Sequence, residues 1–443
     1  MLVVEQLRHR PGGRSLVQMT STERNWAGNV TFGAAEVVHP VSLAELQELM
    51  ASRSKLRVLG SGHSFNPIAG TTGTLVCLDR LGTAVELDPG ARRAWVPAGA
   101  TYAMICPELD AAGWALRNLA SVPHVTVAGA CATGTHGSGR SNPGLAAAVD
   151  AIELVRVGGE LETLSSSATD FSGSVVALGA LGVVTRMRLE LEPSYDVAQE
   201  VWLEVPLGGV LERLDQVLGA GHSVSLFTTW AEPTTLDQVW VKRRVSPGDP
   251  AATGTGEPLD DLLGGHRAPS PAHPVPGADP AHATAQLGLR GPWYERLPHF
   301  RADAVPSAGD ELQSEWLVSA GMGAAALDRL AALAATLAPA VLACEVRAVA
   351  ADEQWLSPTW RRDAVALHFT WRPDEDRVSQ LLHVVEDALA PFDPRPHWGK
   401  LSAMEPAALA RAYPRLADFR ELAERVDPER VLSNPFVDYC LGR

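Results

Sequence analysis

Long apolar runs, basic runs and secretion signals are scarce in this sequence. No stretch is long enough and apolar enough to span a bilayer, so we expect no transmembrane helix. The apolar run in residues 1–13 is too short for a signal peptide. Lys and Arg number 37 against 52 Asp and Glu, which gives a formal net charge of −15. No basic run offsets that charge, which argues against nucleic acid and anionic membranes as partners.

Cysteine is also sparse, and its spacing shows no paired motif. The sequence has five cysteines and no CxxC motif. An odd, scattered set predicts reduced, mostly buried thiols and therefore a reducing compartment. Together with the missing signal peptide, this predicts a cytoplasmic protein. The cysteines are Cys77, Cys106, Cys131, Cys344 and Cys440.

The most informative stretch is the turn GSGHSFN at residues 60–66, which follows a short apolar run at 56–59 that predicts a buried strand. Its two glycines permit positive φ and close backbone approach, and the N–H groups of such a turn suit an anion such as a pyrophosphate. Neither GxGxxG nor GxxxxGK[ST] occurs here, so the common nucleotide fingerprints are absent. A tight turn with an incidental surface histidine, His63, explains these residues equally well.

Residues 121–139 are dense in Gly, Ala, Ser and Thr and nearly free of large side chains. Such a segment lets the backbone lie against a flat ligand and bind it through N–H groups and hydroxyls. A flexible linker is the alternative. Val125 and Val127 add strand character, which favours an ordered segment.

Two later segments, 341–349 and 365–371, alternate polar and apolar residues as strands do. This period places Glu345 and Arg347 on one side of the first strand, and His368 and Thr370 on one side of the second. A solvated sheet face would explain either strand alone. Both together favour a lined cavity, and Lys400 follows in an aromatic-rich turn.

The order of elements predicts an α+β fold rather than a regular alternation. We expect an N-terminal tail at 1–24, a boundary near residues 192–194, and an Ala/Leu-rich helix at 325–337. Residues 250–283 are rich in Pro, Gly, Ala and His, which predicts a long loop or a partly disordered insert.

With these residues in view, the chain resembles the alditol oxidases, which belong with the aldonolactone oxidases in the vanillyl-alcohol-oxidase superfamily of flavoproteins. The resemblance extends from residue 25 to the C-terminus. Its most specific motifs are GSGHSFN (60–66), ASVPH (120–124), ATGTHGSG (132–139), EVR (345–347), HFTW (368–371) and HWGK (397–400).

The resemblance implies an FAD-binding domain in two parts, 25–194 and 401–443, and a substrate domain at 195–400 with an antiparallel sheet backed by helices. It also implies FAD bound covalently through His63, no metal, and a free thiol at Cys131. The residues implied to bind the cofactor are Gly60, Ser61, Gly62, His63, Ser64, Ser121, Thr126, Gly129, Thr133, Gly134, Thr135, His136 and His397, with Val183 or Val184.

The implied reaction is oxidation of the terminal hydroxyl of an alditol, such as xylitol or sorbitol, to the aldose. Hydride passes to flavin N5, and oxygen restores the flavin and gives hydrogen peroxide. The implied substrate-binding residues are Ser121, Glu345, Arg347, Thr370 and Lys400, and the implied catalytic residues are Arg347, His368 and Lys400. We interpret His368 as the proton acceptor because its ordinary pKa is about 6.5.

Two other functions stay open at this point. An aldonolactone oxidase or dehydrogenase would use the same fold and the same charged residues. A function of a different class is a non-catalytic protein that binds sugar or flavin. Binding alone does not require Arg347, His368 and Lys400. We expect a monomer whose partners are the small polyol and molecular oxygen.

Overall fold

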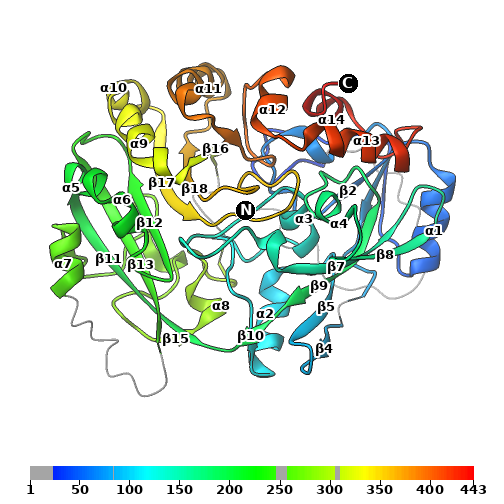
Figure 1. The fold of residues 1–443 in the computed structure, drawn as a ribbon, viewed down its shortest axis with the longest axis horizontal. Helices are drawn as coiled ribbons and strands as arrows, with labels where there is room; N and C mark the ends of the chain where they lie inside the picture. The colour runs from blue at the N-terminus through cyan, green and yellow to red at the C-terminus, as the bar shows by residue number, and fades with distance from the viewer. Residues whose placement is uncertain (1–22, 83, 246–256, 305–309) are drawn as a thin grey trace.

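The computed structural model describes residues 23–82, 84–245, 257–304 and 310–443. Helices and mostly antiparallel sheets are interspersed along the chain, so the α+β prediction is confirmed. Two sheets of the first half lie on one side of the molecule and a large sheet of the second half lies on the other (Figure 1). The segment expected as an N-terminal tail falls outside the described residues except for 23 and 24.

The first half builds a small parallel sheet and a five-stranded antiparallel sheet. The parallel sheet has the order β1-β3-β2, and the antiparallel sheet has the order β4-β5-β9-β7-β8. The strands are β1 (Glu36–Val38), β2 (Leu56–Leu59), β3 (Thr74–Cys77), β4 (Glu86–Asp88), β5 (Arg93–Pro97), β7 (Val149–Val155), β8 (Leu161–Ser165) and β9 (Val183–Glu190). The helices that pack with them are α1 (Leu43–Ser52), α2 (Tyr102–Ala111), α3 (Val127–Ala132) and α4 (Phe171–Ser174). A two-stranded pair, β6 (Trp114–Ala115) and β10 (Glu192–Pro193), follows.

The second half builds a nine-stranded sheet with the order β14-β11-β13-β12-β17-β18-β16-β19, and β15 pairs with β11. The strands are β11 (Asp196–Pro206), β12 (Ser223–Thr228), β13 (Thr235–Val245), β14 (His266–Arg267), β15 (Gly291–Pro292), β16 (Leu312–Ser319), β17 (Val341–Val349), β18 (Ala364–Trp371) and β19 (Arg395–Pro396). Their helices are α5 (Leu207–Glu212), α6 (Leu214–Leu218), α7 (Glu257–Leu263), α8 (Trp293–Arg296), α9 (Gly323–Ala331), α10 (Ala334–Leu337) and α11 (Glu375–Leu389).

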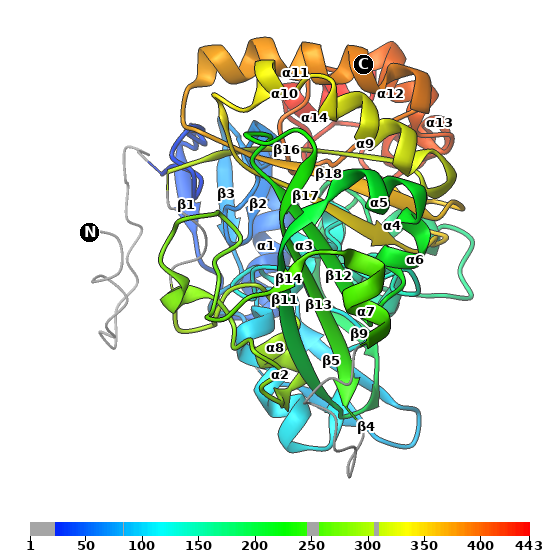
Figure 2. The ribbon, with the colours of Figure 1, turned by 90° about the vertical axis from the view of Figure 1, so that its left-hand side faces the viewer.

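One face of this large sheet is apolar and covered by helices, as Figure 2 shows for α5, α9 and α11. Cys344 and Val346 of β17 and Phe369 of β18 are buried in a single core with those helices. Glu345 and Arg347 therefore point to the opposite face, because successive side chains of a strand alternate. The predicted two-faced pattern of these strands is confirmed.

The C-terminal segment forms α12 (Pro406–Ala412), α13 (Leu416–Val426) and α14 (Pro435–Cys440), and it returns to the first strands of the chain. The Leu56 N–H donates to the Val431 carbonyl at 2.8 Å, and the buried Arg57 guanidinium donates to the Leu432 carbonyl at 2.5 Å. The Asn434 amide donates to the Gly70 carbonyl at 2.7 Å. The first two bonds hold the strand that precedes the glycine turn, and the third holds the segment that follows it.

Three local predictions are corrected. Val127 begins the helix α3 rather than a strand, and the residue before it, Thr126, makes a β-bridge to Thr101. The helix expected at 325–337 is divided into α9 and α10 by a tight turn at Leu333. Part of the expected 250–283 loop is ordered because Leu259 and Leu263, one turn apart on α7, are buried against the large sheet's core; residues 250–256 lie outside the described residues.

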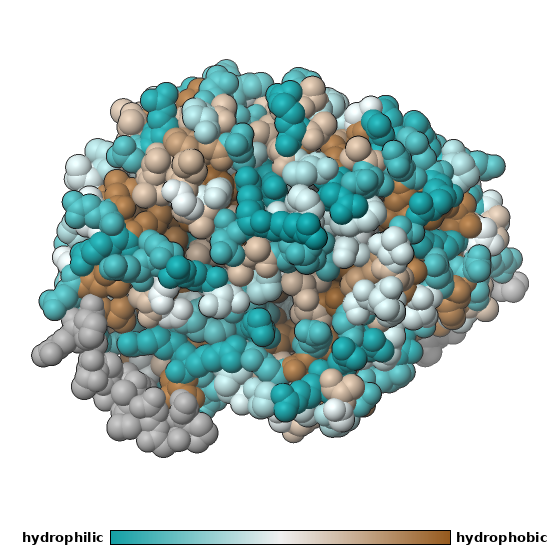
Figure 3. Space-filling model, in the orientation of Figure 1, coloured by the Kyte–Doolittle hydropathy of each residue, from teal (hydrophilic) through white to brown (hydrophobic). Residues whose placement is uncertain are grey.

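All five cysteines are free thiols, as predicted. In the part of the chain that the structure describes, no helix combines the length and apolarity needed to cross a membrane. The face seen in Figure 3 is mainly hydrophilic, and its apolar residues lie in separate areas.

Candidate active site

A cavity of about 290 Å³ lies between the glycine turn and the polar face of the large sheet. Its lining includes segments that are distant in sequence, among them the turn after β2, the small-residue segment around α3, the strands β16, β17 and β18, and the loop after β19. The cavity therefore brings together the separate motifs of the sequence.

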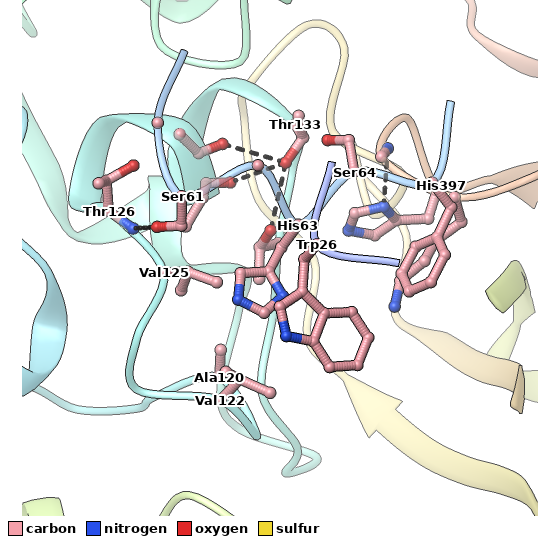
Figure 4. A pocket seen from close by; sticks show the side chains of 18 of the residues that line it. Trp26, Ser61, His63, Ser64, Ala120, Val122, Val125, Thr126, Thr133 and His397 are labelled. Atoms are coloured by element: carbon pink, nitrogen blue, oxygen red, sulfur yellow. Dashed lines mark hydrogen bonds between the residues drawn. The ribbon is translucent and has the colours of Figure 1, made fainter. Parts of the chain in front are cut away.

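The glycine turn approaches α3 closely. A Cβ on Gly60 would lie 2.4 Å from Thr126 Oγ1, so only glycine fits there without displacement. Gly62 has a φ of +69°, a conformation that L side chains rarely adopt. The Ser61 hydroxyl bridges the two segments. It accepts from the Thr126 N–H at 2.8 Å (Figure 4), and it donates to the His124 carbonyl at 2.9 Å.

The His63 ring stacks on the Trp26 ring, with centroids 5.1 Å apart and an interplanar angle of 22° (Figure 4). Burial, with the positive charge of Lys400 and the nearby His124, lowers the pKa of His63 to about 4. The imidazole is therefore neutral at physiological pH, and one of its nitrogens carries a lone pair.

The turn has the features required to hold a pyrophosphate. The backbone N–H groups of residues 61–64 make no hydrogen bond to the rest of the described chain. A row of free N–H groups in a glycine turn is a common binding site for anions. Among the described residues there is no group of three His, Cys, Asp or Glu side chains that could hold a metal ion.

Most residues implied to bind the cofactor line this cavity. They are Gly60, Ser61, Gly62, His63, Ser64, Ser121, Thr126, Gly129, Thr133, Thr135, His136 and His397. Two are not in the lining. Gly134 faces the ring of Pro358, where a Cβ would lie 2.9 Å from Cδ. Val183 points into a core beside β2, so Val184, its neighbour on β9, faces the cavity instead.

Glu345, Arg347 and Glu315 form a buried charged cluster on the polar sheet face. Arg347 Nη2 donates to Glu315 Oε1 at 2.6 Å, and Arg347 Nε lies 3.5 Å from Glu345 Oε2. Burial alone would raise the pKa of Glu345, but Arg347 and His299 outweigh burial and hold it below its usual range. Arg347 Nη1 also donates to the Ser121 hydroxyl at 3.4 Å, which joins the sheet to the small-residue segment.

His368 and Lys400 converge on Gln313 of β16. His368 Nε2 lies 3.1 Å from Gln313 Oε1 and 3.3 Å from Lys400 Nζ, and Lys400 also donates to Gln313 Oε1. Burial and the Lys400 charge lower the pKa of His368 to about 3. Burial lowers the pKa of Lys400 to about 8, so it is mostly charged at neutral pH. Thr370 lines the cavity on the same strand as His368.

His136 and His397 lie together at the boundary between the two halves, with ring centroids 6.1 Å apart. His397 Nδ1 accepts from the Gly399 N–H at 3.0 Å, and burial lowers the pKa of His397 to about 3. His136 Nε2 lies 3.3 Å from Glu315 Oε1. The His136 ring thus connects the small-residue segment to the charged sheet face.

Several lining residues were not predicted. Gln313 and Glu315 alternate on β16 in the same way as Glu345 and Arg347 do on β17, so the period-two pattern could have identified them. Trp26 and His299 lie in segments without any periodic pattern. They reach the cavity only through the tertiary fold.

Comparison with known proteins gives a consistent family. Residues 34–165 match the FAD binding domain family, and residues 310–440 match the family described as D-arabinono-1,4-lactone oxidase. The chain is 46% identical to the alditol oxidase of Streptomyces sp. (strain IKD472 / FERM P-14339) over 422 residues, which are 95% of this chain and 99% of that protein. It is 27% identical to the L-gulono-1,4-lactone dehydrogenase of Mycobacterium tuberculosis (strain ATCC 25618 / H37Rv), with 94% and 98% of the two chains covered.

The fold is shared with proteins of much lower identity. The structure of a solvent-stable cholesterol oxidase superposes with a TM-score of 0.75 at 15% identity and covers 96% of this chain and 97% of that one. Together with the match of residues 34–165 to the FAD binding domain family, this likeness confirms the predicted FAD-binding fold. On the near-complete match to the Streptomyces enzyme and the FAD binding domain in its first half, the chain belongs to the alditol oxidase family of FAD-dependent oxidoreductases.

Proposed function

We propose that this protein oxidises the terminal hydroxyl of an alditol, such as xylitol or sorbitol, to the aldehyde of the aldose. The observation that carries the proposal is the position of Glu345, Arg347, His368 and Lys400 in the same cavity as the glycine turn. A polyol offers many similar hydroxyls, so selection of one requires several fixed hydrogen bonds. The similarity to a protein named alditol oxidase supports this substrate class.

FAD supplies the hydride acceptor when it is bound. The free N–H groups of residues 61–64 would hold its pyrophosphate, and the residues around α3 would lie against the rest of the cofactor. We propose covalent attachment through His63. Its neutral imidazole, with a pKa of about 4, presents a nucleophilic nitrogen, and the Trp26 ring fixes its plane.

The substrate would bind against the sheet face. Glu345 accepts hydrogen bonds from substrate hydroxyls, and Ser121 and Thr370 can donate or accept. Arg347 and Lys400 favour the negative charge that develops on oxygen as the O–H proton leaves. His368 accepts that proton, and it is neutral and therefore competent at physiological pH because its pKa is about 3.

A lactone substrate is the second candidate, supported by the match of residues 310–440 to the family described as D-arabinono-1,4-lactone oxidase. The test is anaerobic reduction of the bound flavin by xylitol, sorbitol and gulonolactone, followed by stopped-flow absorbance. Faster reduction by the alditols supports the proposal. Reduction by gulonolactone alone would replace it with the lactone reaction.

Covalent attachment is tested by acid precipitation. We expect yellow flavin to precipitate with the wild-type protein and to remain in the supernatant with His63→Ala. His266→Ala, at an exposed position on β14, is the matched control and should retain its flavin. Release from the wild-type protein would refute the covalent bond but would leave alditol oxidation open. Oxygen uptake with peroxide detection tests oxygen as the electron acceptor.

We also propose that residues 25–194 and 401–443 form the cofactor domain and residues 195–400 the substrate domain. The arrangement of sheets supports this division, since β1–β5 and β7–β9 lie within 36–190 and the nine-stranded sheet lies within 196–396. We further propose a cytoplasmic monomer, in which the five thiols stay reduced. Light scattering after size exclusion tests the oligomeric state.

A further inference from the structure

His299 lies in a loop after α8, in a segment without a predicted function, and it reaches the polar face of the large sheet. Its ring is buried and held edge-on by two aromatic rings. Its centroid lies 5.6 Å from that of Phe227 at an interplanar angle of 67°, and 5.3 Å from that of Trp240 at 74°. The plane of the imidazole is therefore fixed by packing.

Both ring nitrogens of His299 contact charged groups. Nε2 lies 2.8 Å from Glu345 Oε1, and Nδ1 lies 3.1 Å from Nζ of Lys242 on β13. The Ser225 hydroxyl lies further away, 3.5 Å from Nε2. His299 is thus the connection between a buried lysine and the substrate-facing carboxylate.

Lys242 has a specific set of acceptors. Its side chain is almost fully buried, and Nζ donates to the Leu297 carbonyl at 2.5 Å and to the Pro298 carbonyl at 3.1 Å. Burial lowers the pKa of Lys242 to about 7, so below that pH Nζ is an ammonium group. An ammonium group has three protons and no lone pair, so these two carbonyls and His299 Nδ1 satisfy it completely. Nδ1 must then present its lone pair to Lys242, and the ring proton must reside on Nε2, where it is donated to Glu345.

We propose that Lys242 is a positioning residue for the reaction, because it fixes His299 in the Nε2–H tautomer and thereby holds one oxygen of Glu345 in place. This inference rests on the proposed function. The other oxygen, Oε2, lies 3.5 Å from Arg347 Nε and 4.0 Å from His368 Nδ1, toward the groups assigned to the substrate. With Oε1 occupied, Glu345 presents Oε2 to a substrate hydroxyl.

The opposite tautomer would turn an unprotonated Nε2 toward the carboxylate, and the two lone pairs would repel each other. Glu345 would then move or lose its hydrogen bond, and the substrate would bind more weakly. Lys242 could instead have only a structural role and stabilise the turn at residues 297–299. That role requires the two carbonyl contacts but not the contact to Nδ1. The two roles therefore predict different results.

The first test reads the tautomer directly by NMR of protein labelled with 15N-histidine, without any turnover. The His299 signals are assigned by their loss in His299→Gln. Below about pH 7, where Lys242 is charged, we expect protonation at Nε2 in the wild-type protein and a larger fraction of the Nδ1–H tautomer in Lys242→Met. Protonation at Nδ1 in the wild-type protein would overturn the proposal, whether or not alditols prove to be substrates.

The second test uses two amides that imitate different nitrogens of His299. In His299→Gln the amide can replace Nε2–H and donate to Glu345, whereas in His299→Asn the shorter amide cannot reach it. We expect the KM for the alditol to stay within about 5-fold of wild type in the Gln variant and to rise about 10- to 100-fold in the Asn variant, as loss of a hydrogen bond to a charged group implies. His282→Gln, at an exposed histidine, is the matched control.

Lys242→Met should raise KM by a similar factor, with a smaller change in kcat. A lower melting temperature with unchanged KM would show that Lys242 only stabilises the fold and would refute the positioning role. Equal KM values for the Gln and Asn variants would refute it as well. If Lys242→Met does not fold, the wild-type NMR spectrum and the KM values of His299→Gln and His299→Asn still test the proposal. If no alditol reduces the flavin, the proposed function fails while the tautomer result stands.

Discussion

Lys400 Nζ lies 3.3 Å from His368 Nε2, and both groups contact Gln313 Oε1. A cation next to a histidine opposes protonation of that histidine, and burial opposes it further. The pair therefore consists of a neutral base and a charged donor, with a pKa of about 3 for His368 and about 8 for Lys400. These are the states that proton removal and oxyanion stabilisation require.

The pH dependence of flavin reduction follows from this pair. His368 stays unprotonated above about pH 3, so its titration should not lower the rate between pH 7 and pH 5. Lys400 loses its proton as pH rises through about 8, so the rate should fall on the alkaline side. Stopped-flow reduction by xylitol across the pH range measures both limbs. In Lys400→Arg the side chain stays charged, so the fall in rate should begin at a higher pH. A fall at the same pH as in the wild-type protein would assign that titration to another group.

Removal of the proposed proton acceptor should affect the chemical step most. We expect His368→Ala to lower the rate constant for anaerobic flavin reduction by about 10²- to 10⁴-fold, the usual range for a general base. The Kd for the alditol should change far less, because Glu345 and Arg347 remain. His383→Ala, on the outer helix α11, is the matched control. A near-normal reduction rate in His368→Ala would place the proton acceptor elsewhere.

Arg347 neutralises two buried carboxylates, those of Glu315 and Glu345. Arg347→Met should lower the free energy of unfolding by about 3–5 kcal/mol, because it leaves buried charge without a partner. Urea unfolding measures this loss. The double variant Arg347→Met/Glu315→Gln should recover part of the stability, since one of the unpaired charges is gone. A double variant less stable than the single one would contradict this account.

The close contact between Gly60 and Thr126 predicts a cofactor defect with a defined rescue. In Gly60→Ala the new methyl would lie 2.4 Å from Thr126 Oγ1, so the turn must shift and flavin content should fall. Thr126→Ala removes that oxygen, so Gly60→Ala/Thr126→Ala should bind more flavin than Gly60→Ala. The flavin-to-protein absorbance ratio gives the measurement. Equal ratios in the two variants would mean that the contact does not limit binding.

The sequence predicted local features better than their assembly. Alternation along β17 and β18 placed Glu345, Arg347, His368 and Thr370 on the correct face, because a strand's period is independent of its partners. The same rule could have identified Gln313 and Glu315 on β16. It could not identify His299 or Trp26, since their positions depend on loops and on packing between distant segments. Val127 was misassigned because a valine in a small-residue segment fits a short helix as well as a strand.

The hydrogen bonds between the glycine turn and the later loops have a consequence for biosynthesis. The Phe65 N–H donates to the Gly399 carbonyl, and the Asn66 amide donates to the carbonyls of Trp398 and Lys400, each at 2.8 Å. A chain still emerging from the ribosome can form β2 and its turn early, but it lacks these partners until residue 400 has left the exit tunnel. The proposed attachment of flavin at His63 would therefore be postponed until residues 398–400 have been made.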